Sequence, residues 1–217
     1  MLRGIQTPVG RGTHEVTSLI SWGAAARACS GESESGDAFL IKSVPQGTLI
    51  AVADGLGHGA VAAKAAYTAL TLAGSHATEP LSEIARLCHL ALHGTRGASL
   101  TLARIDGVSR ALTWLGVGSI AGTLLHASIN SYVHESLLLR GGVLGQRIAA
   151  ATSVSLPLLP GDTLVLVTNG VRWYPVGGSP ERAVIAREDP DAAARRLLEE
   201  NAILDDDALA VVARYRG

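Results

Sequence analysis

Aspartates at the ends of apolar runs are the residues of this chain whose positions best suit chemistry. Asp54 ends the run 49–53 and precedes the segment Gly55-Leu-Gly-His-Gly59, whereas Asp37 and the run Asp205-Asp-Asp207 each stand immediately before another apolar run. Hard divalent cations such as Mg²⁺ and Mn²⁺ prefer carboxylate, backbone carbonyl and water oxygens. Two such ions about 4 Å apart would bind a phosphate ester and deliver an activated water in line with the leaving oxygen. Hydrolysis would then need no protein nucleophile.

The glycines after Asp54 allow a second interpretation, a nucleotide-binding loop. Gly55, Gly57 and Ala60 match the G-x-G-x-x-G/A spacing between a strand and a helix. That fold needs a parallel strand after the helix, but a second helix begins near Thr78 instead. Asp54 would also place a negative charge beside the pyrophosphate. We therefore favour a metal site and keep a nucleotide-binding enzyme as the third hypothesis.

The apolar runs predict strands, then two consecutive helices, then further strands. Helices are expected at 58–73, from Thr78 to Ala91, and from Asp189-Pro190 onward. This order argues against the βαβ alternation of a parallel sheet, and it predicts an α+β fold of antiparallel sheets with helices outside. The expected strands are 16–22, 38–44, 48–53, 99–105, 111–117, 120–125, 132–139, 163–168 and 208–214. Because strand ends can converge at one rim, the aspartates are expected to meet there.

Composition limits the classes of protein that need to be considered. The 217 residues are 47% hydrophobic and 17% charged, which suits one domain over 1–217 with a substantial core. The formal charge of −1 and scattered arginines provide no basic face, so no nucleic-acid partner is expected. Neither a signal peptide nor a membrane-spanning run is evident, which indicates a cytoplasmic protein. Two cysteines are too few for a disulfide framework.

Seven segments, distributed over most of the chain, are specific when taken together. They are Gly36-Asp-Ala-Phe39, Val52-Ala-Asp-Gly-Leu-Gly-His-Gly59, Gly97-Ala-Ser-Leu-Thr101, Gly116-Val-Gly-Ser119, Gly141-Gly-Val-Leu-Gly145, Pro160-Gly-Asp-Thr-Leu-Val-Leu-Val-Thr-Asn-Gly170 and Asp206-Asp-Ala208. With them the chain resembles the PPM-type metal-dependent serine/threonine protein phosphatases, and its small size and DGLGHG motif resemble the bacterial branch that reverses partner-switching phosphorylation. The resemblance implies a four-layer α-β-β-α sandwich of two antiparallel sheets flanked by helices, without a flap or regulatory domain.

The resemblance also implies roles for individual residues. Asp54 would bridge two metal ions, Gly55 would contribute its carbonyl, Asp206 would bind one ion, and Asp37 would orient metal-bound water. Asn169 stands where the family's Thr-Asp-Gly carries a metal-binding aspartate. Its amide oxygen can still bind such an ion, but the lost negative charge is expected to weaken one of the two sites. Activity is therefore expected to depend on Mn²⁺ or Mg²⁺ with weak affinity.

Other positions depart from the family pattern or have secondary roles. His58 is a candidate general acid, but larger relatives place a histidine two residues nearer the metal aspartate, so we favour a structural role at the helix start. Asp207 could serve a neighbouring cap or turn. Gly36 replaces a second acid, and Ser33 and Glu34 occupy the region where larger relatives carry a phosphate-binding arginine. Phosphate recognition would then rest on the metals.

The activity implied by the resemblance is hydrolysis of phosphoserine or phosphothreonine on a protein. The expected partners are phosphorylated STAS-domain proteins of a stressosome-like complex, so that the reaction would reset a stress response. A catalytically weak binding module that docks to the same scaffold is the alternative, and Asn169 keeps it open. The phosphosite and the oligomeric state are not predicted.

Overall fold

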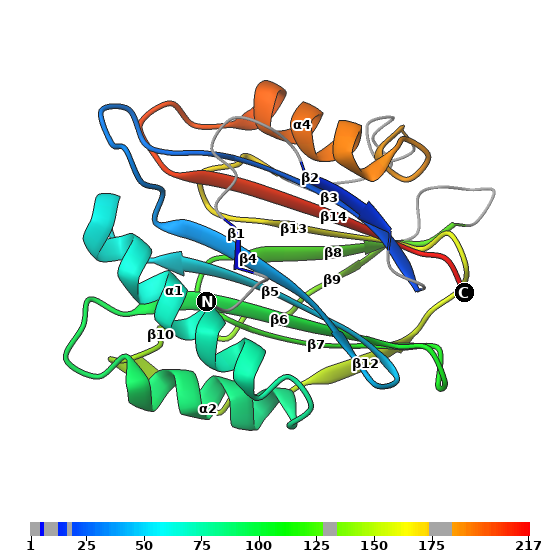
Figure 1. Cartoon of the computed structure of the whole chain (residues 1–217), viewed down its shortest axis with the longest axis horizontal. Coiled ribbons are helices and arrows are strands. Elements are labelled where there is room, and N and C mark those ends of the chain that lie inside the picture. Colours follow the sequence, from blue (N-terminus) through cyan, green and yellow to red (C-terminus); the bar gives the residue numbers. More distant parts are fainter. Residues whose placement is uncertain (1–4, 7–12, 17–18, 128–133, 174–183) are drawn as a thin grey trace.

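Two antiparallel sheets packed face to face form the centre of the molecule, with helices outside (Figure 1). The computed structural model describes residues 5–6, 13–16, 19–127, 134–173 and 184–217. Helices α1 (Gly59–Ser75) and α2 (Leu81–Ala91) cover one sheet, and α4 (Pro190–Asn201) covers the other. This is the predicted four-layer α-β-β-α sandwich. Among the described residues, no helix is both long and apolar enough to cross a membrane.

Sheet A, the sheet under α1 and α2, supplies one half of the site. Its strands in spatial order are β1 (Ile5–Gln6), β4 (Asp37–Val44), β5 (Gly47–Gly55), β6 (Ala98–Asp106), β7 (Ala111–Val117) and β12 (Val154–Pro157). All neighbouring strands in it are antiparallel, and the β4–β5 register places Asp37 directly opposite Asp54. The parallel sheet that the nucleotide-binding hypothesis requires is therefore not formed by these strands.

Sheet B lies under α4 and supplies the other half of the site. Its strands in spatial order are β2 (Thr13–Val16), β3 (Ile20–Arg27), β14 (Ala208–Tyr215), β13 (Thr163–Val167), β8 (Ala121–Leu125) and β9 (His134–Ser136). Strands β13 and β14 are antiparallel neighbours, so the end of β13 lies beside the start of β14. A separate hairpin consists of β10 (Gly142–Val143) and β11 (Arg147–Ile148).

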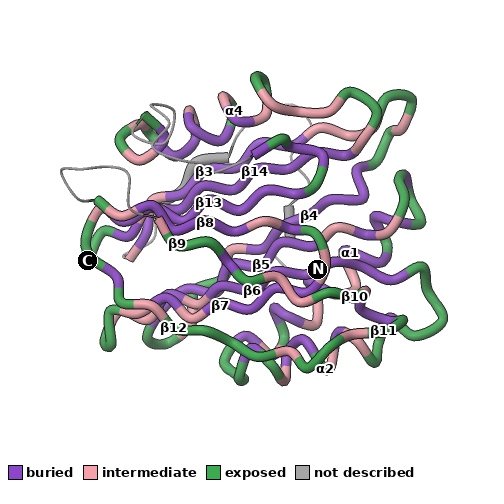
Figure 2. Tube along the Cα trace, turned by 180° about the vertical axis from the view of Figure 1, so that it is seen from behind, coloured by how far each residue is buried: buried purple, intermediate pink, exposed green. Residues whose placement is uncertain are grey.

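Three apolar layers hold the sandwich together, and Figure 2 shows the strands as its most buried part. Between the sheets, Trp22 of β3 and Phe39 of β4 meet edge to face with ring centroids 5.7 Å apart. Outside sheet A, the alanines of α1 allow the helix to lie very close to the strands. A Cβ on Gly55 would stand only 2.0 Å from the carbonyl oxygen of Ala62. Glycine and alanine therefore set the spacing of helix and sheet at the end of β5.

The helix at 189–190 begins as predicted, because its cap residues are strong signals. Pro190 is the first helical residue, and the Asp189 carboxylate accepts hydrogen bonds from the backbone N–H groups of Asp191 and Ala192. The helix predicted at 58–73 is confirmed as α1, and the predicted strand 111–117 coincides with β7.

The predicted strand 16–22 is wrong in its bounds. Strand β2 ends at Val16, and β3 begins at Ile20 and continues to Arg27 through Gly23-Ala-Ala-Ala26. These small residues have little intrinsic preference for strands. Gly23 and Ala25 lie under α4, whereas Ala24 and Ala26 face the core between the sheets. In the run 132–139, the described strand is limited to His134–Ser136, and part of that run lies outside the described residues. Strand β12 and the β10–β11 hairpin were not predicted.

Replacing Gly23 with alanine is expected to lower the free energy of unfolding by about 2 kcal/mol or more. The added Cβ would lie 2.2 Å from the Cα of Asp191, so α4 would have to move away from β3. Urea denaturation monitored by circular dichroism measures the change. Gly141→Ala is the control, because nothing lies within 4 Å of its added Cβ. Equal stability of both variants would contradict the close packing of α4 on β3.

Candidate active site

Strand ends from both sheets meet at one end of the sandwich. Phe39 and Val52 face the core between the sheets, and because side chains alternate along a strand, Asp37 and Asp54 point in the same direction. Asn169 follows β13 in sheet B, and Asp206 precedes β14. Residues from four distant parts of the sequence therefore face one another across the gap between the sheets.

A cavity of about 460 Å³ lies at this end of the molecule. Its lining consists of Asp54, Leu56, Gly57, His58, Ser99, Gly118, Ser119, Gly141, Gly142, Val143, Asn169 and Asp206. Of the predicted site residues, the cavity thus brings together Asp54, His58, Asn169 and Asp206. Asp37 is only 1% exposed and lies behind Asp54 in the register of β4 and β5.

Hydroxyl groups hold both sheet A carboxylates in place. Ser119 Oγ donates to Asp54 Oδ2 at 3.2 Å and lies 3.1 Å from Ser99 Oγ. Thr168 Oγ1 donates to Asp37 Oδ2 at 2.7 Å, which links sheet B to sheet A inside the sandwich. The Asp54 and Asp37 side chains are therefore oriented by neighbouring protein groups.

The same carboxylates are electrostatically unfavourable when they are ionised together. The pKa of Asp54 is raised to about 6, chiefly by burial and further by the charge of Asp206, and the hydrogen bond from Ser119 opposes this rise. Burial also raises the pKa of Asp37 well above its usual range, with a further increase from the charge of Asp54, and the hydrogen bond from Thr168 opposes this. A divalent cation would relieve this repulsion.

The backbone of the glycine-rich loop is already used within the protein. Gly55 N–H donates to the Gly36 carbonyl, and Leu56 N–H donates to the Gly97 carbonyl, both at 3.0 Å. These two amides cannot cradle a phosphate, which adds to the topological argument against nucleotide binding. A Cβ on Gly36 would lie 2.8 Å from the Ala62 Cβ, so this position has no room for the second acid of larger relatives.

Asn169 and Asp206 contact each other across the end of sheet B. Asn169 Nδ2 donates to Asp206 Oδ2 at 3.3 Å, while Asp206 Oδ1 accepts from the backbone N–H of Asp207. The amide nitrogen of Asn169 thus faces the carboxylate, and its oxygen would have to turn inward to bind a cation. Asn169 is exposed and Asp206 is partly exposed, so both are accessible from the cavity.

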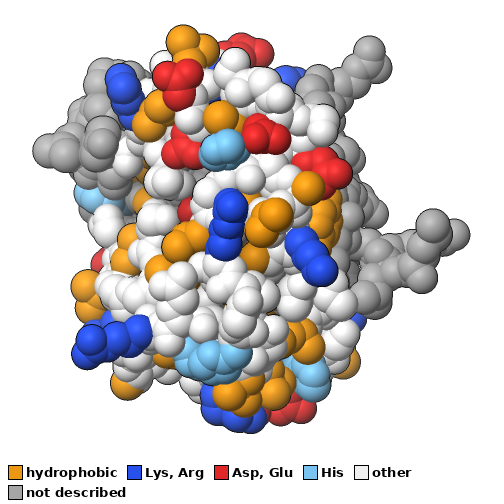
Figure 3. All heavy atoms as spheres, turned by 90° about the vertical axis from the view of Figure 1, so that its left-hand side faces the viewer, with side chains coloured by type: hydrophobic (Ala, Val, Ile, Leu, Met, Phe, Trp, Pro, Cys, Tyr) orange, Lys and Arg blue, Asp and Glu red, His pale blue; other side chains and the backbone are white. Residues whose placement is uncertain are grey.

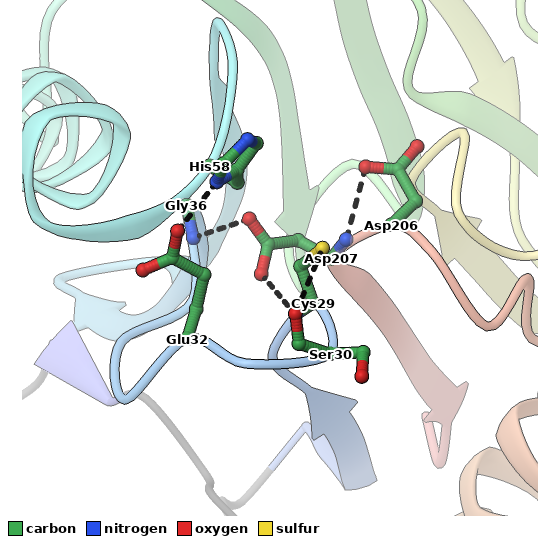
Figure 4. Close-up of polar contacts among 7 residues, drawn as sticks. All are labelled: Cys29, Ser30, Glu32, Gly36, His58, Asp206 and Asp207. Carbon is green, nitrogen blue, oxygen red and sulfur yellow. Dashed lines mark hydrogen bonds and ion pairs between the residues drawn. The ribbon is translucent and has the colours of Figure 1, made fainter.

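The carboxylate of Asp207 is bound by backbone N–H groups of the protein, as Figure 4 shows. Its carboxylate is 3% exposed and accepts hydrogen bonds from Cys29 N–H at 2.8 Å and Gly36 N–H at 2.9 Å. These bonds attach the loop that leads into β4 to the start of β14. Asp207 therefore holds the loop that precedes Asp37 in position, and it does not line the cavity.

His58 is paired with a carboxylate at the start of α1 (Figure 4). Its Nδ1 lies 2.6 Å from Glu32 Oε1, and the side chain is largely exposed. His58 makes no side-chain capping bond to the helix. The contact ties the loop before β4 to the cavity rim.

The oxygen ligands available at the cavity suit a hydrated hard cation. The available groups are the Asp54 and Asp206 carboxylates and the Asn169 amide oxygen, with the Asp37 carboxylate behind Asp54. The Gly55 carbonyl, a ligand implied by the family resemblance, belongs to a residue outside the cavity lining. Within the described part of the chain, no three His, Cys, Asp or Glu side chains are placed to hold one ion. An ion such as Mg²⁺, which uses one or two carboxylates and keeps several waters, fits this arrangement better than an ion that needs an all-protein cage.

Several contributors to the site were not predicted. Ser119, Ser99 and Thr168 orient the aspartates, and the segment 141–143 forms one wall of the cavity. Their segments are part of the family resemblance. Glycine and hydroxyl residues are common in turns of every kind, so their residue types alone did not indicate a role in the site. The hairpin is held by His89, whose Nδ1 accepts a hydrogen bond from Gly145 N–H at 3.1 Å.

The arrangement of sheets and helices is that of the PP2C-type, or PPM, phosphatase domains. A family model described as Stage II sporulation protein E (SpoIIE) matches residues 45–216, which are most of the chain. The chain belongs to the SpoIIE family. This confirms the phosphatase resemblance predicted from the seven segments.

One curated protein and two solved structures are similar to the chain. Phosphoserine phosphatase RsbX of Bacillus subtilis (strain 168) is 31% identical over 102 residues, 47% of this chain and 51% of that protein, so the chain spans about half the length of this curated relative. A chain from a structure of the bacterial stressosome, described as a modular system adapted to control secondary messenger signaling, is 32% identical with a TM-score of 0.81 and coverage of 90% and 99%. RsbX in complex with magnesium shares the fold, with a TM-score of 0.81, 21% identity and coverage of 94% and 99%.

Asp54→Asn is expected to stabilise the metal-free protein by on the order of 2 kcal/mol at pH 7.5. The pKa of Asp54 in the folded protein is about 6, above the usual value of about 3.9 for an unfolded chain. Ionised Asp54 therefore costs stability above pH 6, and this cost disappears as the pH falls toward 4. Chemical denaturation in chelator between pH 4 and 8 measures the effect.

The stabilisation by Asp54→Asn is expected to shrink steadily as the pH is lowered. Asp205→Asn is the control, because Asp205 is exposed in the same acidic run and outside the cavity lining. A metal-free wild-type protein that is more stable than Asp54→Asn at pH 7.5 would show that the cluster is not under electrostatic repulsion.

Proposed function

We propose that the chain is a metal-dependent protein phosphatase that hydrolyses phosphoserine or phosphothreonine on other proteins. The observation that carries the proposal is the meeting of Asp54 from sheet A with Asn169 and Asp206 from sheet B at one cavity, with the buried Asp37 beside Asp54 in the sheet. The SpoIIE family match and the likeness to a phosphoserine phosphatase support it. We infer that residues 1–217 act as a single phosphatase domain in the cytoplasm.

Each part of the chain has a distinct task in this proposal. Asp54, Gly55, Asp206 and Asn169 would hold Mg²⁺ or Mn²⁺, and the bound ions would polarise the phosphate ester and lower the pKa of a bound water. The buried Asp37 carboxylate would accept a hydrogen bond from that water and so orient it. The hydroxyl groups behind the aspartates would keep both carboxylates in position during the reaction.

The substrates we propose are phosphorylated STAS-domain proteins of a stressosome-like complex. Support comes from the likeness to RsbX and to a chain from a bacterial stressosome structure. The open cavity suits a phosphorylated side chain presented on a protein surface, because Asn169 and His58 at its rim are exposed. Removal of the phosphate would return the signalling complex to its resting state.

Asp54→Ala is expected to abolish Mn²⁺-dependent release of phosphate from a phosphorylated STAS-domain protein, because it removes the carboxylate shared by both proposed ion sites. Phosphate release at saturating Mn²⁺ is the measurement. Asp205→Ala is expected to keep wild-type activity, since this exposed side chain does not line the cavity. Undiminished turnover by Asp54→Ala would overturn the assignment.

A binding module with little activity is the second candidate, and the Asn169–Asp206 contact favours it. The Asn169 Nδ2 group donates to the Asp206 carboxylate, which is one of the groups proposed to hold a cation. A module of this kind would bind the phosphorylated scaffold without turnover. Wild-type protein that binds such a scaffold but releases no phosphate at millimolar Mn²⁺ would select the module over the enzyme.

Asn169→Asp is expected to tighten Mn²⁺ binding by about tenfold or more, because it adds a ligand charge and replaces an N–H donor that faces Asp206. Isothermal titration calorimetry of both proteins with Mn²⁺ gives the two affinities. Asn201→Asp is a control for the added charge, because Asn201 lies at the end of α4 outside the cavity lining. An unchanged affinity in Asn169→Asp would exclude residue 169 from the metal site.

A further inference from the structure

Arg96 stands at the rim of the cavity on a segment that is rigidly held. Thr95 Oγ1 accepts a hydrogen bond from Gly97 N–H at 3.0 Å, and the Arg96 carbonyl accepts one from Gln146 Nε2 at 2.7 Å. The Arg96 guanidinium lies against Gly57, since Nη1 is 2.8 Å from the point where a Cβ on Gly57 would stand. Gly57 lines the cavity, so Arg96 places a positive charge directly outside it.

Arg147 adds a second positive charge on the same side. It pairs with Val143 in the β10–β11 hairpin, and paired residues project from the same face of a two-stranded ribbon. Val143 lines the cavity, and its Cγ1 is 2.6 Å from the point where a Cβ on Gly97 would stand. Arg147 therefore shares the face of the hairpin that is turned toward the Arg96 segment. We call Arg96 and Arg147 the basic rim.

Neither guanidinium of the basic rim has a hydrogen-bond or ion-pair partner within the described residues. His58, on the same loop as Gly57, differs because its ring is paired with Glu32. Figure 3 looks onto this end of the molecule, where most of the acidic side chains lie in the upper part of the view and Lys and Arg side chains stand in the middle and lower parts as well as at the upper edges. The cavity thus has an acidic side and a basic side.

We propose that the basic rim binds acidic side chains next to the phosphorylated residue of the substrate protein, and so selects phosphosites in acidic surroundings. The inference rests on the proposed phosphatase function and adds a substrate preference to it. Arg96 and Arg147 do not line the cavity that contains Asp54. A phosphoryl group above Asp54 would therefore occupy the cavity, while the polypeptide on either side of it passes over the rim. Guanidinium groups form charge-assisted, bidentate bonds with carboxylates in such positions.

The test compares two phosphothreonine peptides that differ only in their flanking residues, glutamate in one and lysine in the other. The wild-type protein is expected to hydrolyse the glutamate peptide with the higher kcat/KM, through a lower KM. The double variant Arg96→Glu, Arg147→Glu is expected to invert this preference, with roughly a 2- to 5-fold change for each exposed contact. The preference should weaken as salt is raised.

Two controls separate the rim from the reacting centre. Hydrolysis of p-nitrophenyl phosphate, which has no flanking chain, is expected to be unchanged in the double variant. Arg216→Glu reverses one charge beyond the far end of β14 and is expected to leave the peptide preference unchanged. Equal use of both peptides by the wild-type protein, or an equal loss on p-nitrophenyl phosphate, would overturn the proposal.

Failure of the phosphatase function gives a different result. If the wild-type protein hydrolyses none of these substrates, peptide binding is measured by fluorescence anisotropy in the Asp54→Asn background. Tighter binding of the glutamate peptide, lost when Arg96 and Arg147 are reversed, would support the basic rim without catalysis. Equal binding of both peptides would overturn it.

Discussion

Negative charge concentrated at one end of the sandwich is the constraint on which the site depends. The β4–β5 register holds Asp37 opposite Asp54, and the packing of the sheets brings Asp206 toward them. Among the described residues, no lysine or arginine forms an ion pair with these three acids. Burial and mutual repulsion raise the pKa values of Asp37 and Asp54, so the fold keeps them together at a cost in stability. Such a cost is typical of sites at which an external cation or substrate completes the charge balance.

Small residues make this concentration possible because they allow backbone segments to approach closely. Gly36 and Gly55 contact each other through a backbone hydrogen bond, and Ala62 of α1 fills the space where side chains would be at either position. The buried Asp207 then joins the loop before β4 to the start of β14 through two backbone N–H groups. Not every acid near the site therefore lines the cavity. Asp207 is satisfied by the backbone and holds in place the strand ends that carry the others.

The sequence was informative where a residue type and a strand end coincide. Asp37 and Asp54 stand at the boundaries of strongly apolar strands, so their convergence followed from an antiparallel fold. The hydroxyl groups of Ser119 and Thr168 could not be assigned in this way, because their roles depend on contacts with residues 65 and 131 positions away. The predicted strand ended at residue 22, whereas β3 continues to Arg27, for a similar reason. Gly23 and the alanines that follow it have poor strand propensity, and they take this conformation because α4 packs on Gly23 and Ala25 while Ala24 and Ala26 face the core between the sheets.

Acidic residues in the cavity and basic residues at its rim would orient a bound substrate, with the phosphoryl group in the cavity and the flanking chain over the rim. The acidic side comes from strand ends in the two large sheets, whereas the basic rim comes from the turn before β6 and from the small β10–β11 hairpin. The hairpin is attached through Gln146 to Arg96, through Gly145 to His89, and through two backbone hydrogen bonds between Leu144 and Ala98 at the start of β6. Changes to an exposed hairpin side chain such as Arg147 would therefore alter which polypeptide approaches the cavity, whereas changes at Leu144 would reach β6, which pairs with the strand that carries Asp54.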